Sequence, residues 1–395
     1  MQHIVVFEQN NVWIGPHYDN LVHMGAKYTP CMRADERILQ QIQKDREIEA
    51  SQTGCCITDD SCFQTSSCNT QFASFSKVVK YDGYKLPVVC GQDPRFCNDS
   101  QRHTWTSDIS KWPVCESNVD GIPKRERHMH CKISGRPCCI QMHGQCRITT
   151  KEYCDFVRGY YHENATLCSQ VSCLNQVCGM SPFLRKDHPD QFYRFILPLF
   201  IHAGILRLLI TCALQFTIMR RFEKMIGCVR LALIYFVSGF GGYLASASFV
   251  PYMPEVGPAG SQGGVLGALI INLIYNWKYL KSPRRALSFH LAVAFGLFLT
   301  GFLPYIDNWA QIFGFLFGVL MAIALIPYFE FGKYTRFAIA SASLAIIGTM
   351  LVFLLILFYG FPVIDIPILT MLNCPFSSNK VCHQQGLILR NWLPI

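Results

Sequence analysis

The sequence predicts an α-helical polytopic membrane protein that carries a cysteine-rich, disulfide-stapled domain. Hydrophobic residues make up 51% of the 395 residues and charged residues only 15%, a low charged fraction for a soluble protein of this size. Most charges precede Pro189, whereas residues 195–359 are largely apolar. Sixteen of the 20 cysteines lie between Cys31 and Cys178. Two regions with different physical properties therefore share the chain.

Six apolar runs are long enough, at about 20 residues each, to cross the hydrocarbon core of a bilayer. They are residues 195–218, 228–250, 258–276, 286–304, 309–327 and 337–359. Lys and Arg follow the first, third and fifth runs, whereas the joints at 251–257 and 304–308 contain neither. The positive-inside rule places the joints without Lys or Arg outside the cytosol. We therefore expect a lumenal or extracellular domain at 1–190, a six-span membrane domain at 191–360 and a lumenal tail at 361–395.

The cysteines favour an oxidising compartment. Those before the first run are even in number and lie in sequence rich in turn formers, as in disulfide-stapled domains. Cys374 and Cys382 in the tail form a further candidate pair on the same side of the membrane. Glycosylation sequons at Asn98 and Asn164 agree with this location. The spacing of the cysteines does not determine how they pair.

Other readings of the polar region are weaker. Zinc ligation by Cys55-Cys56 and Cys138-Cys139 is disfavoured because paired C-x2-C knuckles are missing, so we expect neither a metal nor a cofactor. A basic run at 124–132 is interpreted as a solvated loop rather than a nucleic-acid site. Residues 34–50 read as a short helix with acidic residues in its first turn. No signal peptide is recognisable, so we expect an upstream spanning helix, a seventh, to carry the polar region across the membrane.

The first apolar run contains a histidine, an arginine and a threonine whose spacing matches a known motif. Residues 202–211 read His-Ala-Gly-Ile-Leu-Arg-Leu-Leu-Ile-Thr. This resembles the H-A-x-x-x-H-x-x-x-N helix of the rhomboid family of intramembrane serine proteases, in which two histidines and an asparagine line the oxyanion pocket. Only His202 matches, because Arg207 replaces the second histidine and Thr211 the asparagine.

The third run begins with a glycine-rich stretch of Gly257, Pro258, Ala259, Gly260, Ser261 and Gln262. Rhomboids have G-x-S-G with the nucleophilic serine at this point. Two alignments are open, and the nucleophile position falls on Ala259 in one and on Gln262 in the other. Neither leaves an attacking hydroxyl. Ser261 is displaced in both, and one residue of helix turns a side chain by about 100°.

The fifth run resembles the A-H-x-x-G-x-x-x-G helix that carries the rhomboid general base. Gln311 takes the place of that base, and an amide cannot accept a proton at a useful pH. Gly314 and Gly318 retain a small-xxx-small face that permits close helix packing. A serine-histidine dyad needs both a nucleophile and a base, and the sequence supplies neither.

Together these features resemble the iRhom family of inactive rhomboids, which is marked by a Pro in the G-P-A-G-S-Q stretch and by a large cysteine-rich lumenal domain. Residues 190–194, Asp-Gln-Phe-Tyr-Arg, add to the match. Some members of the family keep a His where Gln311 stands, so Pro258 is the more specific mark. The resemblance spans almost the whole chain but leaves out the family's long cytosolic N-terminal region and first span.

The resemblance implies a pseudoprotease that binds single-pass membrane clients. The expected clients are the tumour-necrosis-factor-converting metalloprotease, escorted toward the surface, or growth-factor-family ligands, delivered to degradation. The expected location is the endoplasmic reticulum membrane, with the Golgi and plasma membrane as further sites. Two alternatives remain open: an active protease using Ser261 with His202 as base, and a channel or transporter, for which the runs offer few polar residues.

Arg207 lies near the middle of its run, where an unpaired charge costs at least about 2.5 kcal/mol. We expect it to fill the former oxyanion pocket and to bond to Gln262, Gln311 or backbone carbonyls. The alternative is that it snorkels to the nearer interface. His202 is interpreted as a structural histidine hydrogen-bonded between helices. Asp307 is expected to cap the helix that follows it.

Overall fold

The computed structural model describes residues 11–59, 61–68, 77–98, 105–116, 121–140, 142–185, 187–328 and 332–361. These residues form two compact units. The helical unit contains the described residues of Met1–Arg33, Gly179–Ser181 and Pro189–Ile388, and the disulfide unit contains those of Ala34–Cys178 and Pro182–His188. The helical unit thus includes residues 11–33 in addition to the predicted membrane domain. Cys374 and Cys382 lie outside the described residues.

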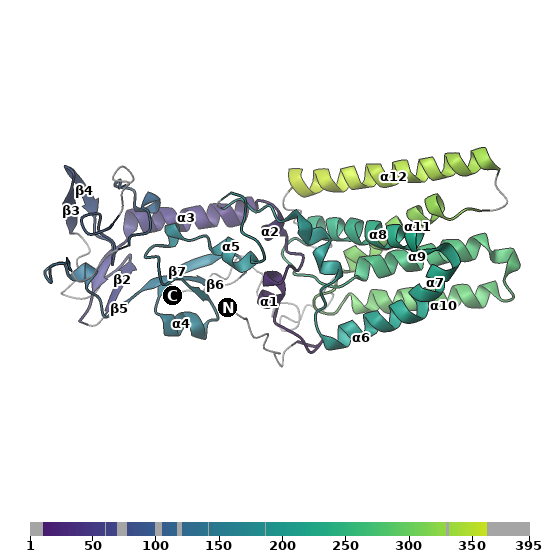
Figure 1. The fold of residues 1–395 in the computed structure, drawn as a ribbon, viewed down its shortest axis with the longest axis horizontal. Helices are drawn as coiled ribbons and strands as arrows, with labels where there is room; N and C mark the ends of the chain where they lie inside the picture. Colours follow the sequence, from purple (N-terminus) through teal and green to yellow (C-terminus); the bar gives the residue numbers. More distant parts are fainter. Residues whose placement is uncertain are drawn as a thin grey trace. The chain divides into compact units, whose positions relative to one another are not determined.

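Helices of 7 to 28 residues run side by side in the helical unit (Figure 1). They are α6 (Ile205–Leu214), α7 (Arg220–Ile226), α8 (Cys228–Phe249), α9 (Ala259–Tyr275), α10 (Pro283–Thr300), α11 (Asn308–Leu325) and α12 (Lys333–Gly360). Short elements are α1 (Tyr18–His23), α2 (Thr29–Met32), and the 3-10 turns η6 (Phe192–Phe195), η7 (Leu197–Leu199) and η9 (Trp277–Tyr279). By length and apolarity, α8, α11 and α12 qualify as membrane spans, and α9 is a shorter apolar helix.

The first predicted span differs from the expected continuous helix. Its beginning consists of η6 and η7, with Pro198 inside η7, and α6 begins only after Gly204. Proline lacks the N–H that a helix interior needs. The helix then continues through a π-helical turn, η8 (Gln215–Met219), into α7. Helical structure therefore covers 205–226 rather than 195–218.

Glycines bring α8, α9 and α11 into backbone contact. A Cβ atom added to Gly314 would overlap the carbonyl of Gly260, and one added to Gly318 would overlap that of Gly264. On the other side, a Cβ on Gly242 would lie 2.6 Å from the Ala310 oxygen. Small residues allow this approach, which maximises van der Waals packing between helices in lipid. These contacts fix the relative positions of the helices that carry the catalytic motifs.

The segment around Lys27, which precedes the disulfide unit in sequence, is hydrogen-bonded to the loop between α8 and α9. Lys27 and Glu255 exchange backbone hydrogen bonds of 2.9 and 3.0 Å. The Lys27 ammonium donates to the Val250 carbonyl at 2.9 Å and lies 3.6 Å from the Glu255 carboxylate. Ser246 donates to the same carboxylate at 2.7 Å. Lys27 is 0% exposed and Glu255 is 3% exposed. Because both charges are buried, removing either one would leave the other without its partner, at a large cost in stability.

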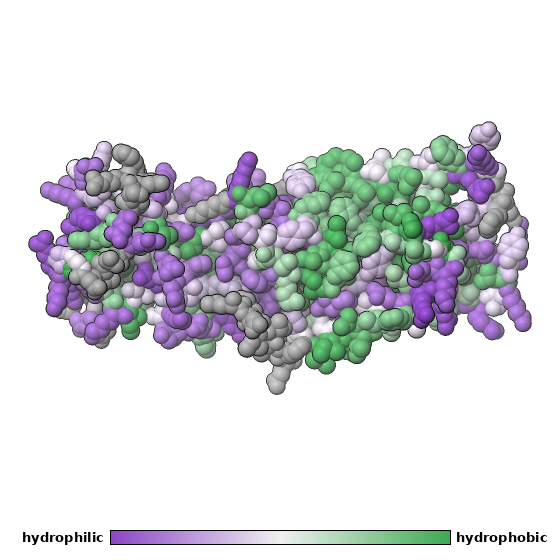
Figure 2. Space-filling model, in the orientation of Figure 1, coloured by the Kyte–Doolittle hydropathy of each residue, from purple (hydrophilic) through white to green (hydrophobic). Residues whose placement is uncertain are grey.

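The surface of the helical unit is predominantly hydrophobic over its helices (Figure 2). Exposed apolar side chains include Phe216, Val229, Phe295, Phe337 and Phe353. Exposure of large aromatic side chains along several helices is unfavourable in water and expected in lipid. This surface supports the multi-pass membrane character of the unit.

The close glycine contacts predict a position-dependent effect of added volume. Gly314→Val should destabilise the helical unit by about 1–3 kcal/mol, because the new side chain would force α9 and α11 apart. Gly348→Val on α12 is the matched control, since a Cβ there meets nothing within 4 Å. Thermal unfolding of the purified chain in detergent measures both, and equal melting temperatures for the two variants would contradict the packing argument.

The disulfide unit is built from short elements. Its sheets have the orders β1-β2-β5, β3-β4 and β7-β6-β8, formed by β1 (Gly54–Ile57), β2 (Ser61–Thr65), β3 (Val78–Tyr81), β4 (Tyr84–Pro87), β5 (Ile133–Ser134), β6 (Arg136–Ile140), β7 (Gln145–Thr149) and β8 (Tyr160–Tyr161). Its helical elements are α3 (Glu36–Gln52), α4 (Lys151–Phe156), α5 (Cys173–Cys178), η2 (Ile109–Lys111), η4 (Arg127–Met129) and η5 (Cys168–Gln170). The predicted helix at 34–50 is α3, which begins two residues later because the Asp35 carboxylate caps it by accepting from the Arg37 and Ile38 N–H groups.

Disulfides replace a large apolar core in this unit, as predicted. They join Cys55–Cys90, Cys56–Cys68, Cys62–Cys131, Cys97–Cys115, Cys138–Cys154, Cys139–Cys173 and Cys146–Cys168. Both adjacent pairs considered as zinc ligands are therefore bonded to sulfur. Cys212 and Cys228 of the helical unit are free thiols. Such cross-links stabilise small domains by restricting the unfolded chain.

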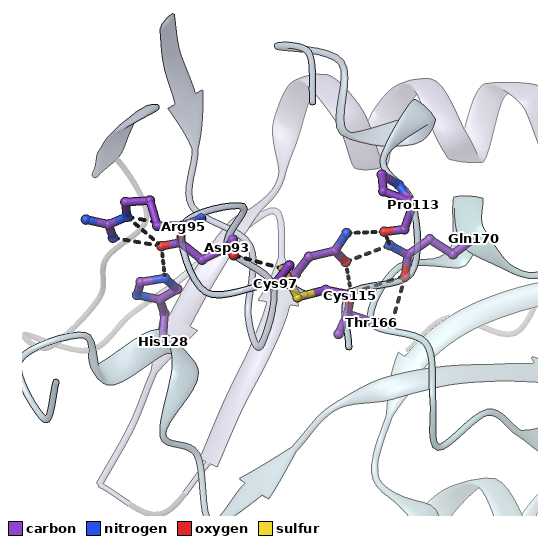
Figure 3. Close-up of a disulfide and its surroundings, with 9 residues drawn as sticks. Asp93, Arg95, Cys97, Pro113, Cys115, His128, Thr166 and Gln170 are labelled. Carbon is purple, nitrogen blue, oxygen red and sulfur yellow. Dashed lines mark hydrogen bonds and ion pairs between the residues drawn. A yellow bond between two sulfur atoms is a disulfide. The ribbon is translucent and has the colours of Figure 1, made fainter. Parts of the chain in front are cut away.

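A buried charge network lies beside the Cys97–Cys115 disulfide (Figure 3). The Asp93 carboxylate accepts from the Arg95 guanidinium at 2.7 Å and contacts His128 Nε2 at 3.1 Å. Glu126 lies 3.2 Å from the same guanidinium. His128 is 1% exposed, so the prediction of a solvated basic loop was wrong for this residue. Its hydrogen bond with the Asp93 carboxylate stabilises it in the buried position. Burial raises the pKa of Asp93, but hydrogen bonds from His128 and Arg95 outweigh burial and hold it well below its usual value.

This network predicts an acid-labile contribution to stability. Because the folded-state pKa of Asp93 lies below its unfolded value of about 3.9, the folded state binds fewer protons, and the contribution is lost as pH falls below about 4. Asp93→Asn should weaken the unit by about 1–3 kcal/mol at neutral pH. Hydrogen exchange of residues 88–97 in the full chain measures this, with Asp108→Asn as a more exposed control. Unchanged protection in Asp93→Asn would contradict the assignment.

Candidate functional site: a rhomboid centre without nucleophile or base

The start of α9 carries the glycine-rich stretch that resembles the nucleophile motif of rhomboids. Gly257 precedes it with a φ of +100°, a left-handed conformation that favours glycine. Ala259, the first residue of α9, offers only a methyl group. Ser261 is fully buried, and its hydroxyl donates to the Tyr235 carbonyl of α8 at 2.8 Å. The serine hydroxyl thus serves as a helix-to-helix hydrogen bond rather than as a nucleophile.

Gln262 occupies the other candidate nucleophile position and faces α6. Its amide nitrogen lies 3.4 Å from the Thr211 hydroxyl, so the residues that replace the nucleophile and the asparagine contact each other. The side-chain oxygen of Gln262 is buried and accepts no hydrogen bond among the described residues. The carboxamide beside the Thr211 hydroxyl cannot act as the base that a hydroxyl needs to become a nucleophile.

The position of the general base lies on the first turn of α11. Asp307 caps this helix by accepting from the Trp309 and Ala310 N–H groups at 2.9 and 3.4 Å, as predicted. Gln311 is 7% exposed, and its side-chain nitrogen has no hydrogen-bond partner in the described part of the chain. The base position is therefore built and buried, but it holds an amide that cannot take a proton.

His202 and Arg207 belong to the segment that leads into α6. The imidazole Nε2 of His202 is buried without a partner among the described residues, so the expected hydrogen bond between helices is not made through this nitrogen. Arg207 is 0% exposed, which excludes the snorkelling alternative. Its three guanidinium nitrogens also lack hydrogen-bond partners in the described part. The expected bonds from Arg207 to Gln262, Gln311 or backbone carbonyls are therefore not formed.

Trp13 is a site residue that the sequence did not reveal. Its ring lies 5.8 Å from the Arg207 guanidinium carbon, and its indole N–H donates to the Pro304 carbonyl at 2.8 Å. Trp13 is separated from Arg207 by the whole disulfide unit in sequence, so no local pattern connects them. Tyr235, the partner of Ser261, was also missed by the sequence analysis.

A group of side chains with possible metal-ligand spacing lies outside this centre. Within the described residues, one group with possible ligand spacing lies in the disulfide unit: Asp93, Glu126 and His128, with atoms within 4.8 Å of one another. Arg95 already pairs with both of those carboxylates. A guanidinium in that position disfavours a second cation by direct repulsion.

Comparison with known proteins agrees with the geometry. Residues 189–328 match the model of the Rhomboid domain. The chain is 45% identical to human Inactive rhomboid protein 1 over 405 aligned residues and 43% identical to human Inactive rhomboid protein 2 over 402. Inactive rhomboid protein 1 of Danio rerio is 42% identical over 404. These alignments cover 96–98% of this chain and 47% of each relative, so the chain spans about half the length of the curated relatives it matches.

The class that fold and site define is a rhomboid pseudoprotease: a helical membrane core with the catalytic helices in place and a disulfide-rich domain. The chain belongs to the inactive rhomboid family. The alternative hypothesis of an active protease, with Ser261 as nucleophile and His202 as base, is not supported by the structure. The Ser261 hydroxyl donates to the Tyr235 carbonyl, and among the described residues no hydrogen bond joins this hydroxyl to an imidazole.

The role of Ser261 predicts a structural rather than a chemical phenotype. Ser261→Ala should lower the stability of the helical unit by about 0.5–1.5 kcal/mol, the net value of one intramolecular hydrogen bond. The same substitution should not change the amount of cleavage product formed from a model transmembrane substrate that is incubated with the chain. Thermal unfolding in detergent and a cleavage assay with purified protein measure the two effects. Loss of a cleavage product in Ser261→Ala would contradict this assignment.

Proposed function

We propose that this protein binds single-pass membrane proteins and controls their trafficking or degradation in the secretory pathway without cutting them. The observation that carries the proposal is the combination of an intact helical scaffold with a site that has lost both reactive groups. The glycine contacts keep α8, α9 and α11 together, whereas Ala259 and Gln311 supply no chemistry. A scaffold of this kind can still bind a transmembrane segment.

A client helix has a surface available beside the former base. Gly263 of α9, Ala294 and Leu297 of α10, and Gln311 and Phe315 of α11 line a groove of about 190 Å³. None of the α10 side chains is buried, so this helix packs loosely in the described structure. An apolar groove with one amide suits a spanning helix that carries a single polar residue.

The disulfide unit offers a second surface for the ectodomain of a client. A groove of about 530 Å³ runs between α3 and β7 and contains charges of both signs, including Asp45, Arg46, Glu49 and Arg147. Mixed charge in a concave surface favours specific polar contacts with a partner protein. Glycans on Asn98 and Asn164, both exposed, are part of the proposal for a lumenal or extracellular location.

The identity of the clients is proposed from the resemblance to the inactive rhomboid family. The candidates are the tumour-necrosis-factor-converting metalloprotease and growth-factor-family ligands. The proposed compartments are the endoplasmic reticulum membrane, the Golgi and the plasma membrane. Escort and degradation are the two outcomes to be distinguished by following the abundance and surface level of each client.

Crosslinking in cells tests client binding. The chain should recover a full-length single-pass metalloprotease or growth-factor precursor under mild detergent, without shortened products. Ala294→Trp should fill the groove and reduce recovery about fivefold or more, equivalent to about 1 kcal/mol. Leu344→Trp on the exposed side of α12 is the matched control.

Two results would count against the proposal. The first is equal recovery by Ala294→Trp and Leu344→Trp, which would place the client elsewhere. The second is the appearance of client fragments whose formation depends on this chain, because a pseudoprotease that holds clients intact produces none.

A further inference from the structure

The guanidinium of Arg207 is the most unusual charged group in the helical unit. It is fully buried, and Nε, Nη1 and Nη2 all lack hydrogen-bond partners among the described residues. The Trp13 ring at 5.8 Å gives it a cation–π contact at the edge of the useful range. A buried charge without hydrogen bonds costs several kcal/mol. An acceptor would offset this cost, and no described side chain of the site, including the unbonded Gln262 oxygen, makes a hydrogen bond with the guanidinium.

Two buried carboxylates of the helical unit, Glu255 and Asp307, have partners other than Arg207. Glu255 receives the Ser246 hydroxyl and lies beside the Lys27 ammonium. Asp307 receives two N–H groups at the start of α11. No ion pair joins either carboxylate to Arg207 in the described structure. The charge of Arg207 is therefore not neutralised by these acids.

The guanidinium lies beside the turn that leads into α9. A Cβ atom placed on Gly257 would be 3.9 Å from Arg207 Nε, which is an ordinary contact distance. Pro258 is the N-cap residue of α9, and no side chain caps this 17-residue helix. The first N–H groups of a helix have no partner within the helix and carry a partial positive charge. The Arg207 guanidinium and the N–H groups at the start of α9 thus form one region of positive electrostatic potential.

The start of α6 differs from the start of α9 in this respect. Its first two N–H groups, on Ile205 and Leu206, donate to the carbonyls of Ile14 and Trp13 at 3.2 and 3.3 Å. The segment that contains Trp13 therefore satisfies the end of α6 and at the same time places its ring near Arg207. Of the two helix ends near the guanidinium, α9 is the one that remains without a cap of this kind.

We propose that Arg207 and the first turn of α9 bind a small anion, of the size of a halide ion or a carboxylate group. Such a ligand would accept hydrogen bonds from the guanidinium and from backbone N–H groups, the pairing that helix N-termini provide for anions. It would neutralise the buried charge in the place where an oxyanion forms in an active protease. A free halide and a carboxylate share this chemistry and differ in source.

Trp13 provides an optical probe of the site, because iodide quenches indole fluorescence on contact. The purified chain in detergent is titrated with iodide, and a bulky sulfonate, 2-(N-morpholino)ethanesulfonate, keeps the ionic strength constant. We expect a saturable component of quenching above a linear collisional background. Trp13→Phe should remove that component. Chloride and formate, added in separate titrations, should compete with iodide if the site takes halides and carboxylates respectively.

Charge variants assign the site to Arg207. In Arg207→Gln the half-saturation concentration should rise at least about tenfold, equivalent to about 1.4 kcal/mol, or the saturable component should vanish. Arg230→Gln is the matched control, since Arg230 is exposed on α8 and donates to a backbone carbonyl. Linear quenching of the unmodified chain, or saturable quenching that survives in Arg207→Gln, would overturn the proposal.

A second measurement covers the case in which Arg207→Gln does not fold. The melting temperature of the unmodified chain should rise with chloride or with formate and not with a bulky sulfonate such as 2-(N-morpholino)ethanesulfonate, because a ligand of the native state stabilises it by mass action. Equal melting temperatures in all three salts would overturn the proposal without any variant. This readout does not depend on client binding, so its failure is distinct from failure of the proposed function.

Discussion

Backbone contact between α9 and α11 fixes the geometry on which the rest of the helical unit depends. Gly260 and Gly264 meet Gly314 and Gly318 so closely that a single methyl group would separate the helices. This contact places the start of α9 and the first turn of α11 side by side whatever side chains they carry. Loss of chemistry therefore required only side-chain replacement, because the scaffold is held by residues that have no side chains.

The replacements leave a site that is polar, buried and poorly satisfied. His202, Gln262 and Gln311 each retain a buried polar atom without a partner in the described structure. Buried groups of this kind normally find hydrogen bonds, and exceptions concentrate at functional places. Ser261 is different because its hydroxyl is used between α8 and α9. Ser261 thus has a structural role, whereas the other three side chains keep polar atoms without hydrogen-bond partners in the described structure.

The sequence predicted the two-part organisation, the disulfides and the helix at 34–50, because these follow from composition, cysteine number and local periodicity. The candidate degenerate positions could be named because they lie inside motifs with fixed spacing: Gln311 for the base, and either Ala259 or Gln262 for the nucleophile. It did not reveal the 3-10 turns before α6, where Pro198 interrupts an otherwise apolar run. The approach of Trp13 to Arg207 was equally hidden, because it depends on chain segments about 190 residues apart brought together only by the tertiary fold.

One hydrogen bond shows how the disulfide unit is inserted into the chain. The Gln191 N–H donates to the Cys31 carbonyl at 3.2 Å, and both residues belong to the helical unit. The points at which the polypeptide leaves for the disulfide unit and returns from it are therefore neighbours. An excursion with adjacent ends leaves the host fold's own connectivity undisturbed, and its length carries only a logarithmic entropic cost. Inserted domains of very different size can accordingly be accommodated at this point without altering the bundle that receives them.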